Sequence, residues 1–267
     1  MKKKIIAGIG LLSLAISGAA AAASIDPISP IQHGPLRDHH PHDDGTSTSS
    51  NWSGYAVTGT NFTDAKASWV VPTATCASTP SSYAAFWVGL DGYTSKTVEQ
   101  TGTDSDCSGK TPKYYAWYEF YPKPSRTISG FTVKPGDKID AEVSYSGSKF
   151  TLTITDETTG QTKTESGAVS GASRNSAEWI AEAPCCQSNG NVLPLSDFGT
   201  VDFGLDYTKV SSTNFASSTS VSGAISAFGS NVDQINMGDK SSGVVKASTS
   251  SLSSDGTSFT VTWKAEN

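Results

Sequence analysis

Histidine is nearly absent from this sequence. The chain has four histidines in 267 residues, namely His33, His39, His40 and His42, so residues 48–267 contain none. A Ser-His or Cys-His nucleophilic system uses an imidazole as its base, which excludes such a system from this part of the chain. Catalytic zinc sites also normally use histidine. The Asp-Thr-Gly and Asp-Ser-Gly motifs of aspartic peptidases are missing too, so carboxylates, lysine and tyrosine remain as acid–base candidates.

Charged residues are scarce as well. They make up 16% of the chain, and the formal net charge is −6 at pH 7, which argues against a nucleic-acid partner. With few lysines and arginines, the protein gains little positive charge when its carboxylates protonate, and this favours a fold that is stable in acid. The alternative is that such a surface is ordinary for a secreted β-protein.

The chain also lacks an apolar run of the roughly 20 residues that a membrane-spanning helix needs. Its one apolar run, residues 5–16, follows Lys2-Lys3-Lys4 and precedes the small residues 19–23. This order is typical of a secretory signal peptide, so we predict that residues 1–23 are removed near Ala23. A retained anchor is the alternative. The mature protein is then expected to be extracellular, with no membrane attachment.

Residues 24–47 show no apolar periodicity and contain four prolines and all four histidines. Such a composition predicts a pro-segment or a flexible leader. Residues 48–267 remain as one domain, since all-β domains of this size are common. We expect this domain to be a monomer.

Four cysteines in an exported chain suggest disulfides. Cys76 and Cys107 flank one segment of the domain, and we favour a bond between them. Cys185 and Cys186 are adjacent, and the sequence leaves open whether they bond to each other or stay reduced.

Alternation of apolar and polar residues predicts several short strands. Apolar residues alternate with polar ones over 131–133, 139–145, 150–154 and 259–263, and Gly-containing turns separate several of these segments. This pattern predicts an all-β fold, an antiparallel sandwich or barrel.

Polar and aromatic residues gather in four further segments, 86–92, 98–102, 115–122 and 177–184. Because alternate residues of a strand share a face, Glu178 and Glu182 lie on one face but roughly 13 Å apart, too far to act as a close pair. A partner for either must come from another strand. On the inner face of a curved sheet, one cleft is expected to be lined by Trp52, Trp87, Asp91, Gln100, Glu119, Tyr121 and Glu182.

The motifs in these segments, and their order along the chain, resemble those of the glutamic peptidases (eqolisins). This chain is similar to a secreted member of bacterial type. The segments that carry the resemblance are Asn51-Trp-Ser-Gly, Trp87-Val-Gly-Leu-Asp-Gly, Gln100-Thr-Gly, Tyr115-Ala-Trp-Tyr-Glu-Phe-Tyr-Pro and Ala177-Glu-Trp-Ile-Ala-Glu. The resemblance implies a β-sandwich of two antiparallel sheets, of the concanavalin or jelly-roll kind. It also implies that Gln100 and Glu182 are the catalytic pair, and that the supporting or substrate-lining positions are Trp52, Trp87, Asp91, Glu119 and Tyr121.

The chemistry of an acid endopeptidase fits this pair. An ionised Glu182 can take a proton from water and return one to the leaving nitrogen, while the Gln100 amide stabilises the oxyanion. A carboxylate base with a pKa near 4.3 works best in acid. The substrates would be polypeptides, and no metal or organic cofactor is needed.

Two other functions fit the same pattern less well. A glycoside hydrolase would pair Glu119 with Glu182, but that chemistry gives no role to the amide of Gln100. A lectin-like binding module would explain the aromatic residues but not a pro-segment.

The histidines of the leader suggest control by pH. With pKa values near 6.5 they are mostly neutral at pH 7.5 and charged at pH 5. We predict that the leader shields the cleft near neutrality and that the protein removes residues up to about 47 in acid. The alternative is a spacer with incidental histidines.

Overall fold

The computed structural model describes residue 1, residues 27 and 29, residues 31–186 and residues 191–267. Most of the predicted signal peptide, residues 2–23, therefore lies outside the described residues. Within the described ranges, no helix is long and apolar enough to cross a membrane.

Two β-sheets make up the domain. The first sheet, in spatial order, consists of β9 (Arg126–Thr127), β8 (Thr111–Tyr121), β7 (Val98–Ser108), β6 (Ala85–Leu90), β13 (Ser176–Glu182), β4 (Trp52–Thr58) and β18 (Val232–Asp239). The second consists of β12 (Gln161–Gly167), β11 (Lys149–Asp156), β10 (Lys138–Ser146), β5 (Asp64–Val70), β15 (Thr200–Phe203), β20 (Phe259–Trp263) and β19 (Val244–Thr249). β16 (Phe215–Ser217) also pairs with β5, and β17 (Ser222–Ala224) pairs with β16.

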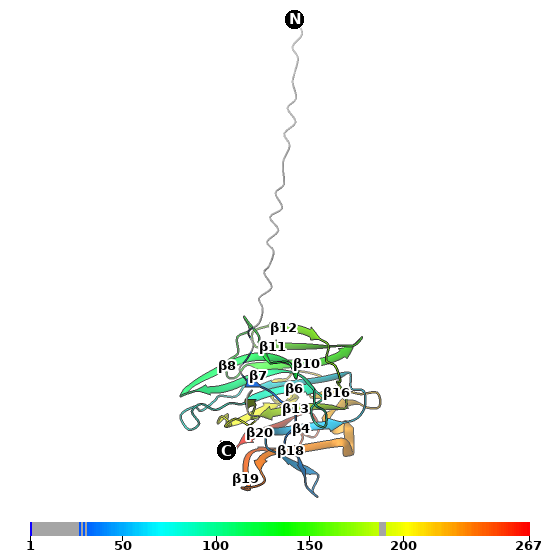
Figure 1. Ribbon diagram of the computed structural model, residues 1–267. Helices are drawn as coiled ribbons and strands as arrows, with labels where there is room; N and C mark the ends of the chain where they lie inside the picture. The colour runs from blue at the N-terminus through cyan, green and yellow to red at the C-terminus, as the bar shows by residue number, and fades with distance from the viewer. Residues whose placement is uncertain (2–26, 28, 30, 187–190) are drawn as a thin grey trace.

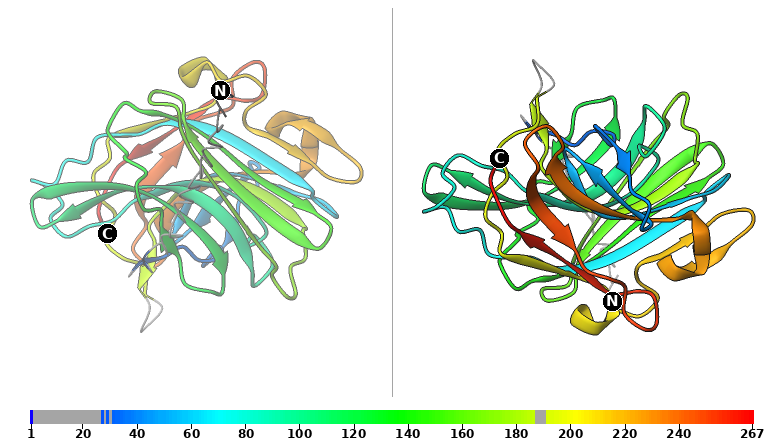
Figure 2. Two further views of the ribbon diagram at one scale, coloured as in Figure 1. Left: turned by 90° about the horizontal axis from the view of Figure 1, so that it is seen from above. Right: turned by 90° about the horizontal axis from the view of Figure 1, so that it is seen from below.

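The two sheets are joined through β19, which pairs with β18 of the first sheet and β20 of the second. Figure 1 shows the strands crossing the domain from β12 to β19, and in Figure 2 the orange and red strands β18–β20 lie side by side. In the described residues, helical structure is limited to α1 (Leu205–Thr208) and the 3-10 helix η1 (Ile225–Asn231). The predicted antiparallel β-sandwich is confirmed.

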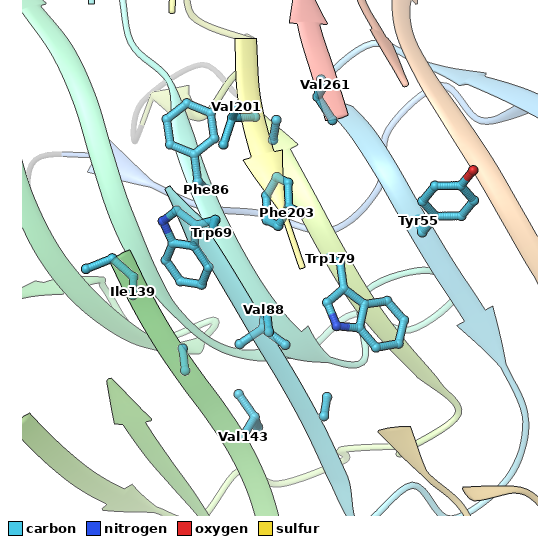
Figure 3. Packing of buried hydrophobic residues seen from close by; sticks show 14 of the residues in the cluster. Tyr55, Trp69, Phe86, Val88, Ile139, Val143, Trp179, Val201, Phe203 and Val261 are labelled. Carbon is cyan, nitrogen blue, oxygen red and sulfur yellow. The ribbon is translucent and has the colours of Figure 1, made fainter. Parts of the chain in front are cut away.

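The main core lies between the sheets because each sheet turns one apolar face inward. Trp69 and Phe203 come from the second sheet, and Phe86, Val88 and Trp179 come from the first (Figure 3). All five are fully buried. Burying apolar side chains of this size stabilises the fold by roughly 1.5–3 kcal/mol each.

Most predicted strands are present, and one is not. The alternating segments 139–145, 150–154 and 259–263 form β10, β11 and β20. The prediction of a strand at 131–133 is wrong, although Phe131 and Val133 are buried. The amide of Gln161 takes the place of a neighbouring strand by bonding to both backbone groups of Thr132.

The disulfide predicted between Cys76 and Cys107 is confirmed. It ties the start of the segment that leads to β6 to the end of β7. The Cys185 side chain is buried, whereas the side chain of Cys186 lies outside the described part of the structure.

The first sheet has a second apolar cluster on the face turned away from the main core. Trp52, Trp87, Trp117 and Ile180 lie at its centre. We call this the site face.

Much of the segment predicted as a leader packs on the domain. Its strands are β1 (Ile31–Gln32), β2 (His40–Pro41) and β3 (Thr46–Ser49). β1 pairs with β14 (Cys185–Cys186), and β3 pairs in parallel with β18. β3 therefore spans the predicted boundary between residues 47 and 48.

Candidate active site

Strand register collects the polar residues of the site face into two rows. In an antiparallel sheet, paired residues point to the same face. One row runs across the sheet through Glu119, Gln100, Gly89 and Glu178, and the other through Tyr115, Asp104, Ala85, Glu182 and Trp52. The sequence predicted that a partner of Glu182 comes from another strand, and the residues paired with Glu182, Trp52 and Ala85, lie on β4 and β6.

Glu182 ends β13 and is fully buried. Its Oε2 accepts a 2.8 Å hydrogen bond from Trp87 Nε1, and its Oε1 accepts bonds from the Gly34 amide at 3.1 Å and Asn51 Nδ2 at 3.5 Å. Burial is the main cause that raises the pKa of Glu182 to about 8, while the donors oppose the rise. A carboxylate that accepts several N–H bonds is held in one orientation.

Gln100 lies in β7, and its side-chain amide points at a backbone carbonyl. Its Nε2 donates to His33 O at 2.6 Å and to Glu119 Oε2 at 3.2 Å. Burial also raises the pKa of Glu119. Gly89, the neighbour of Gln100 on β6, must be small because a methyl group there would lie 2.9 Å from the Trp87 ring.

The imidazole of His33 is held by an aromatic face and two carboxylates. It stacks on Trp117 with ring centroids 3.5 Å apart and an angle of 3° between the planes. Its Nε2 lies 3.3 Å from Asp104 Oδ1, and its Nδ1 lies 3.6 Å from Glu119 Oε2. Burial alone would lower the pKa of His33, but the two carboxylates outweigh burial and raise the pKa to about 10.

Of the predicted supporting residues, the structure brings Trp52, Trp87, Glu119 and Tyr121 to this site. Trp52 packs edge-on against Trp87 and donates from Nε1 to Gly34 O at 3.1 Å. Tyr121 is half-buried and packs against the same aromatic cluster.

Asp91 has a different position. Its carboxylate accepts hydrogen bonds from the backbone amides of residues 173, 174 and 175 at 2.8–3.0 Å. The residue therefore anchors that loop at the end of the site face.

Sequence reasoning missed Asn51, Asp104 and Asp106 as side chains of the site region. Tyr115 donates to Asp104 at 2.7 Å and to Asp106 at 2.8 Å. Asp104 lies four residues after Gln100 on the same strand face, so the alternation used for Glu178 and Glu182 would have found it. Asn51 had no comparable signal, because its role depends on its contact with Glu182.

Buried carboxyl groups should make the fold more stable in acid than in base. Burial raises the pKa of Glu99 to about 9 and of Glu182 to about 8, and it also raises the pKa values of Glu119 and Glu178. Such groups bind more protons when folded than when unfolded, where their pKa is about 4, so stability falls as pH rises from about 4 to 9. The raised pKa of His33 acts in the same direction between pH 6.5 and about 10.

We expect the free energy of unfolding to be greater at pH 5 than at pH 9 by more than about 2 kcal/mol. Denaturant unfolding of the Glu182→Gln variant measures this without self-digestion. Equal or greater stability at pH 9 would contradict the prediction.

Comparisons with known proteins point to one family. Residues 50–263 match the model of the peptidase A4 family. The chain is 34% identical to aspergillopepsin-2 of Aspergillus niger in an alignment of 178 positions, and the match covers 58% of this chain and 62% of that protein. It is 36% identical to scytalidopepsin B of Scytalidium lignicola in an alignment of 181 positions, and the match covers 66% of this chain and 68% of that protein.

A solved structure is also similar. The crystal structure of scytalido-glutamic peptidase with a transition state analog inhibitor superposes with a TM-score of 0.66 and 27% identity. The superposition covers 80% of this chain and 98% of the chain in that structure.

Proposed function

Because this chain belongs to the peptidase A4 family, the glutamic peptidases that its motifs resemble, we propose that it is an endopeptidase that cuts polypeptides in acid with Glu182 and Gln100. One observation carries the assignment of the pair. A peptide bond of the chain itself, between His33 and Gly34, has its oxygen 2.6 Å from Gln100 Nε2 and its nitrogen 3.1 Å from Glu182 Oε1.

These contacts correspond to the two demands of peptide hydrolysis. Glu182 takes a proton from the attacking water and later gives one to the leaving nitrogen. Gln100 donates a hydrogen bond to the oxygen that becomes negative. The bond from Gln100 Nε2 to Glu119 and the bond from Trp87 Nε1 to Glu182 orient the two side chains.

The state of Glu182 depends on what covers it. With residues 33 and 34 over the site, burial keeps the pKa of Glu182 at about 8, so the carboxyl is mostly protonated in acid. A water-filled cleft removes this burial, and the pKa then falls toward the ordinary value of about 4.3. The open site can therefore provide an ionised base in mild acid.

We expect the enzyme to be secreted and to act as a monomer. Residues 1–23 have the order of a signal peptide, and this segment would direct export. The substrates would be unfolded polypeptides. The proposal is tested by incubating the enzyme with an unfolded protein in acid and measuring the peptides that are released.

Removing the hydrogen bond from Trp87 should change the pH profile. Trp87 Nε1 donates to Glu182 and thereby lowers the pKa of this carboxyl. Trp87→Phe removes the donor and keeps an aromatic ring, so the pKa of Glu182 rises. We expect the acid limb of the kcat/KM profile to move to higher pH by about one unit, because one charge-assisted bond contributes about 1.5 kcal/mol.

The profile should be measured on one peptide for the wild type and the variant. Trp69→Phe is a matched control, since Trp69 donates to Thr103 between the sheets. An unshifted acid limb in Trp87→Phe, or an equal shift in the control, would contradict this role.

A further inference from the structure

The segment before the domain lies across the site in the manner of a substrate. Successive backbone groups of His33 and Gly34 are all bound by site side chains. Glu119 accepts from the His33 amide at 3.1 Å, Gln100 donates to the His33 carbonyl, Glu182 accepts from the Gly34 amide, and Trp52 donates to the Gly34 carbonyl at 3.1 Å. All four side chains are fully buried under this segment.

The side chain of His33 fills a built subsite. Its ring lies flat on Trp117, and the carboxylates of Asp104 and Glu119 approach its two nitrogens. An imidazolium satisfies both features, because a cation is attracted by an aromatic face and by carboxylates.

The chain on the other side of this peptide bond is held as well. Asn51 Nδ2 donates to Pro35 O at 3.2 Å, Leu36 N donates to Gly92 O at 3.0 Å, and Arg37 N donates to Asn51 Oδ1 at 2.9 Å. A methyl group on Gly34 would make an ordinary contact, 3.5 Å from Cys185 Sγ, so alanine would also fit at this position. Residues on both sides of the bond are therefore fixed in register.

We propose that the protein cuts its own chain between His33 and Gly34, and that the subsite of Trp117, Asp104 and Glu119 recognises the protonated imidazole of His33 for this cut. The proposal rests on the proposed function of Glu182 and Gln100. It assigns a processing site within the segment that precedes the domain.

The step is a hydrolysis with water as the co-reactant. When the segment lifts enough to admit water, the water oxygen bonds to the His33 carbonyl carbon and Glu182 takes the water proton. Gln100 holds the resulting oxyanion. The bond to Gly34 nitrogen then breaks, its electron pair stays on that nitrogen, and Glu182 returns the proton. The products are a carboxyl group on His33 and an amine on Gly34.

The cut leaves residues 34–49 with the domain. β3 is paired with β18 and β2, so residues 46–49 are held by their own hydrogen bonds, and residues 34–45 stay joined to them through the chain. The new N-terminus is then Gly34, not residue 48.

The test uses the purified full chain. The wild type, Glu182→Gln, His33→Ala, His33→Arg and His42→Ala are each incubated at about pH 4 and about pH 7, and intact masses are followed over time. His42 is a control because it is exposed and bonds to Thr48. A denatured protein is added to parallel samples to measure cleavage of a separate substrate.

We expect the wild type to yield a chain that begins at Gly34 and Glu182→Gln to yield none. His33→Ala should slow the cut at least about 10-fold. His33→Arg should slow it less than His33→Ala does, because a guanidinium group keeps the charge and the planar shape. His42→Ala should change the rate less than about 2-fold. The proposal would be overturned by a first cut at another bond or by cutting in Glu182→Gln at the wild-type rate. It would also be overturned if His33→Ala and His33→Arg were both cut as fast as the wild type.

The parallel samples separate the two proposals. If the wild type digests the added protein but leaves the bond between His33 and Gly34 intact, this inference is wrong and the proposed function stands. If neither is cut, this inference is wrong, because the intact segment still covers Gln100 and Glu182. The proposed function is then decided on protein whose covering segment has been released at an inserted protease sequence.

Discussion

Replacing Glu182 with glutamine is expected to lower kcat/KM for a peptide substrate by roughly 10²–10⁴-fold, the usual contribution of general acid–base catalysis. Glutamine keeps the size of the side chain and can still accept from Trp87 Nε1, which donates to Oε2 at 2.8 Å. It can neither take a proton from water nor protonate the leaving nitrogen. The loss should therefore appear in kcat at every pH tested.

The covering segment must be released in the same way from each protein before this comparison. Residues 42–45 form an exposed turn, where a recognition sequence for a specific protease can be inserted and cut. Glu178→Gln is the matched control. Glu178 shares strand and face with Glu182, and burial raises its pKa well above the usual range, so an amide replaces a group that is already neutral. Near-normal turnover in Glu182→Gln, or an inactive Glu178→Gln variant, would show that Glu182 is not the catalytic acid–base residue.

Replacing Gln100 with alanine should lower kcat by roughly 10²–10³-fold, the cost of removing one oxyanion donor. KM should change much less, because the donor acts mainly on the charge that develops during the reaction. The bond from Gln100 Nε2 to Glu119 Oε2 fixes the amide before substrate arrives. Steady-state kinetics on the peptide used for Glu182→Gln measure both constants.

Gln161→Ala is the control for this experiment, since Gln161 lies on β12 in the second sheet and bonds to Thr132. A variant of Gln100 with normal kcat and a raised KM would show that the amide only binds substrate. The oxyanion would then need another donor.

Local patterns were enough to predict an all-β fold, and the family resemblance favoured a sandwich of two sheets over a barrel. Alternation over 139–145 and 150–154 gave β10 and β11 because one face of each strand packs into the core between the sheets. The same rule placed Glu178 and Glu182 on one face. The pairing that puts Gln100 opposite Glu119 depends on register between strands, and the family resemblance supplied what alternation alone does not.

The rest of the site depends on contacts between distant segments. His33 lies 86 residues from Glu119 in the chain, and Gly34 lies 148 residues from Glu182. No periodicity in residues 24–47 indicates that two of them pack against the site face. The loop that Asp91 anchors is likewise more than 80 residues away, so its role was not visible in the motif around Asp91.

Digestion of a denatured protein tests the central claim most directly. The wild type and Glu182→Gln, each with the covering segment released at the inserted sequence, are incubated with the substrate at about pH 4, and the products are identified by mass spectrometry. We predict that the wild type releases internal peptides while Glu182→Gln releases none above the enzyme-free blank. No peptides from the wild type, or the same peptides at the same rate from both proteins, would contradict a peptidase that depends on Glu182.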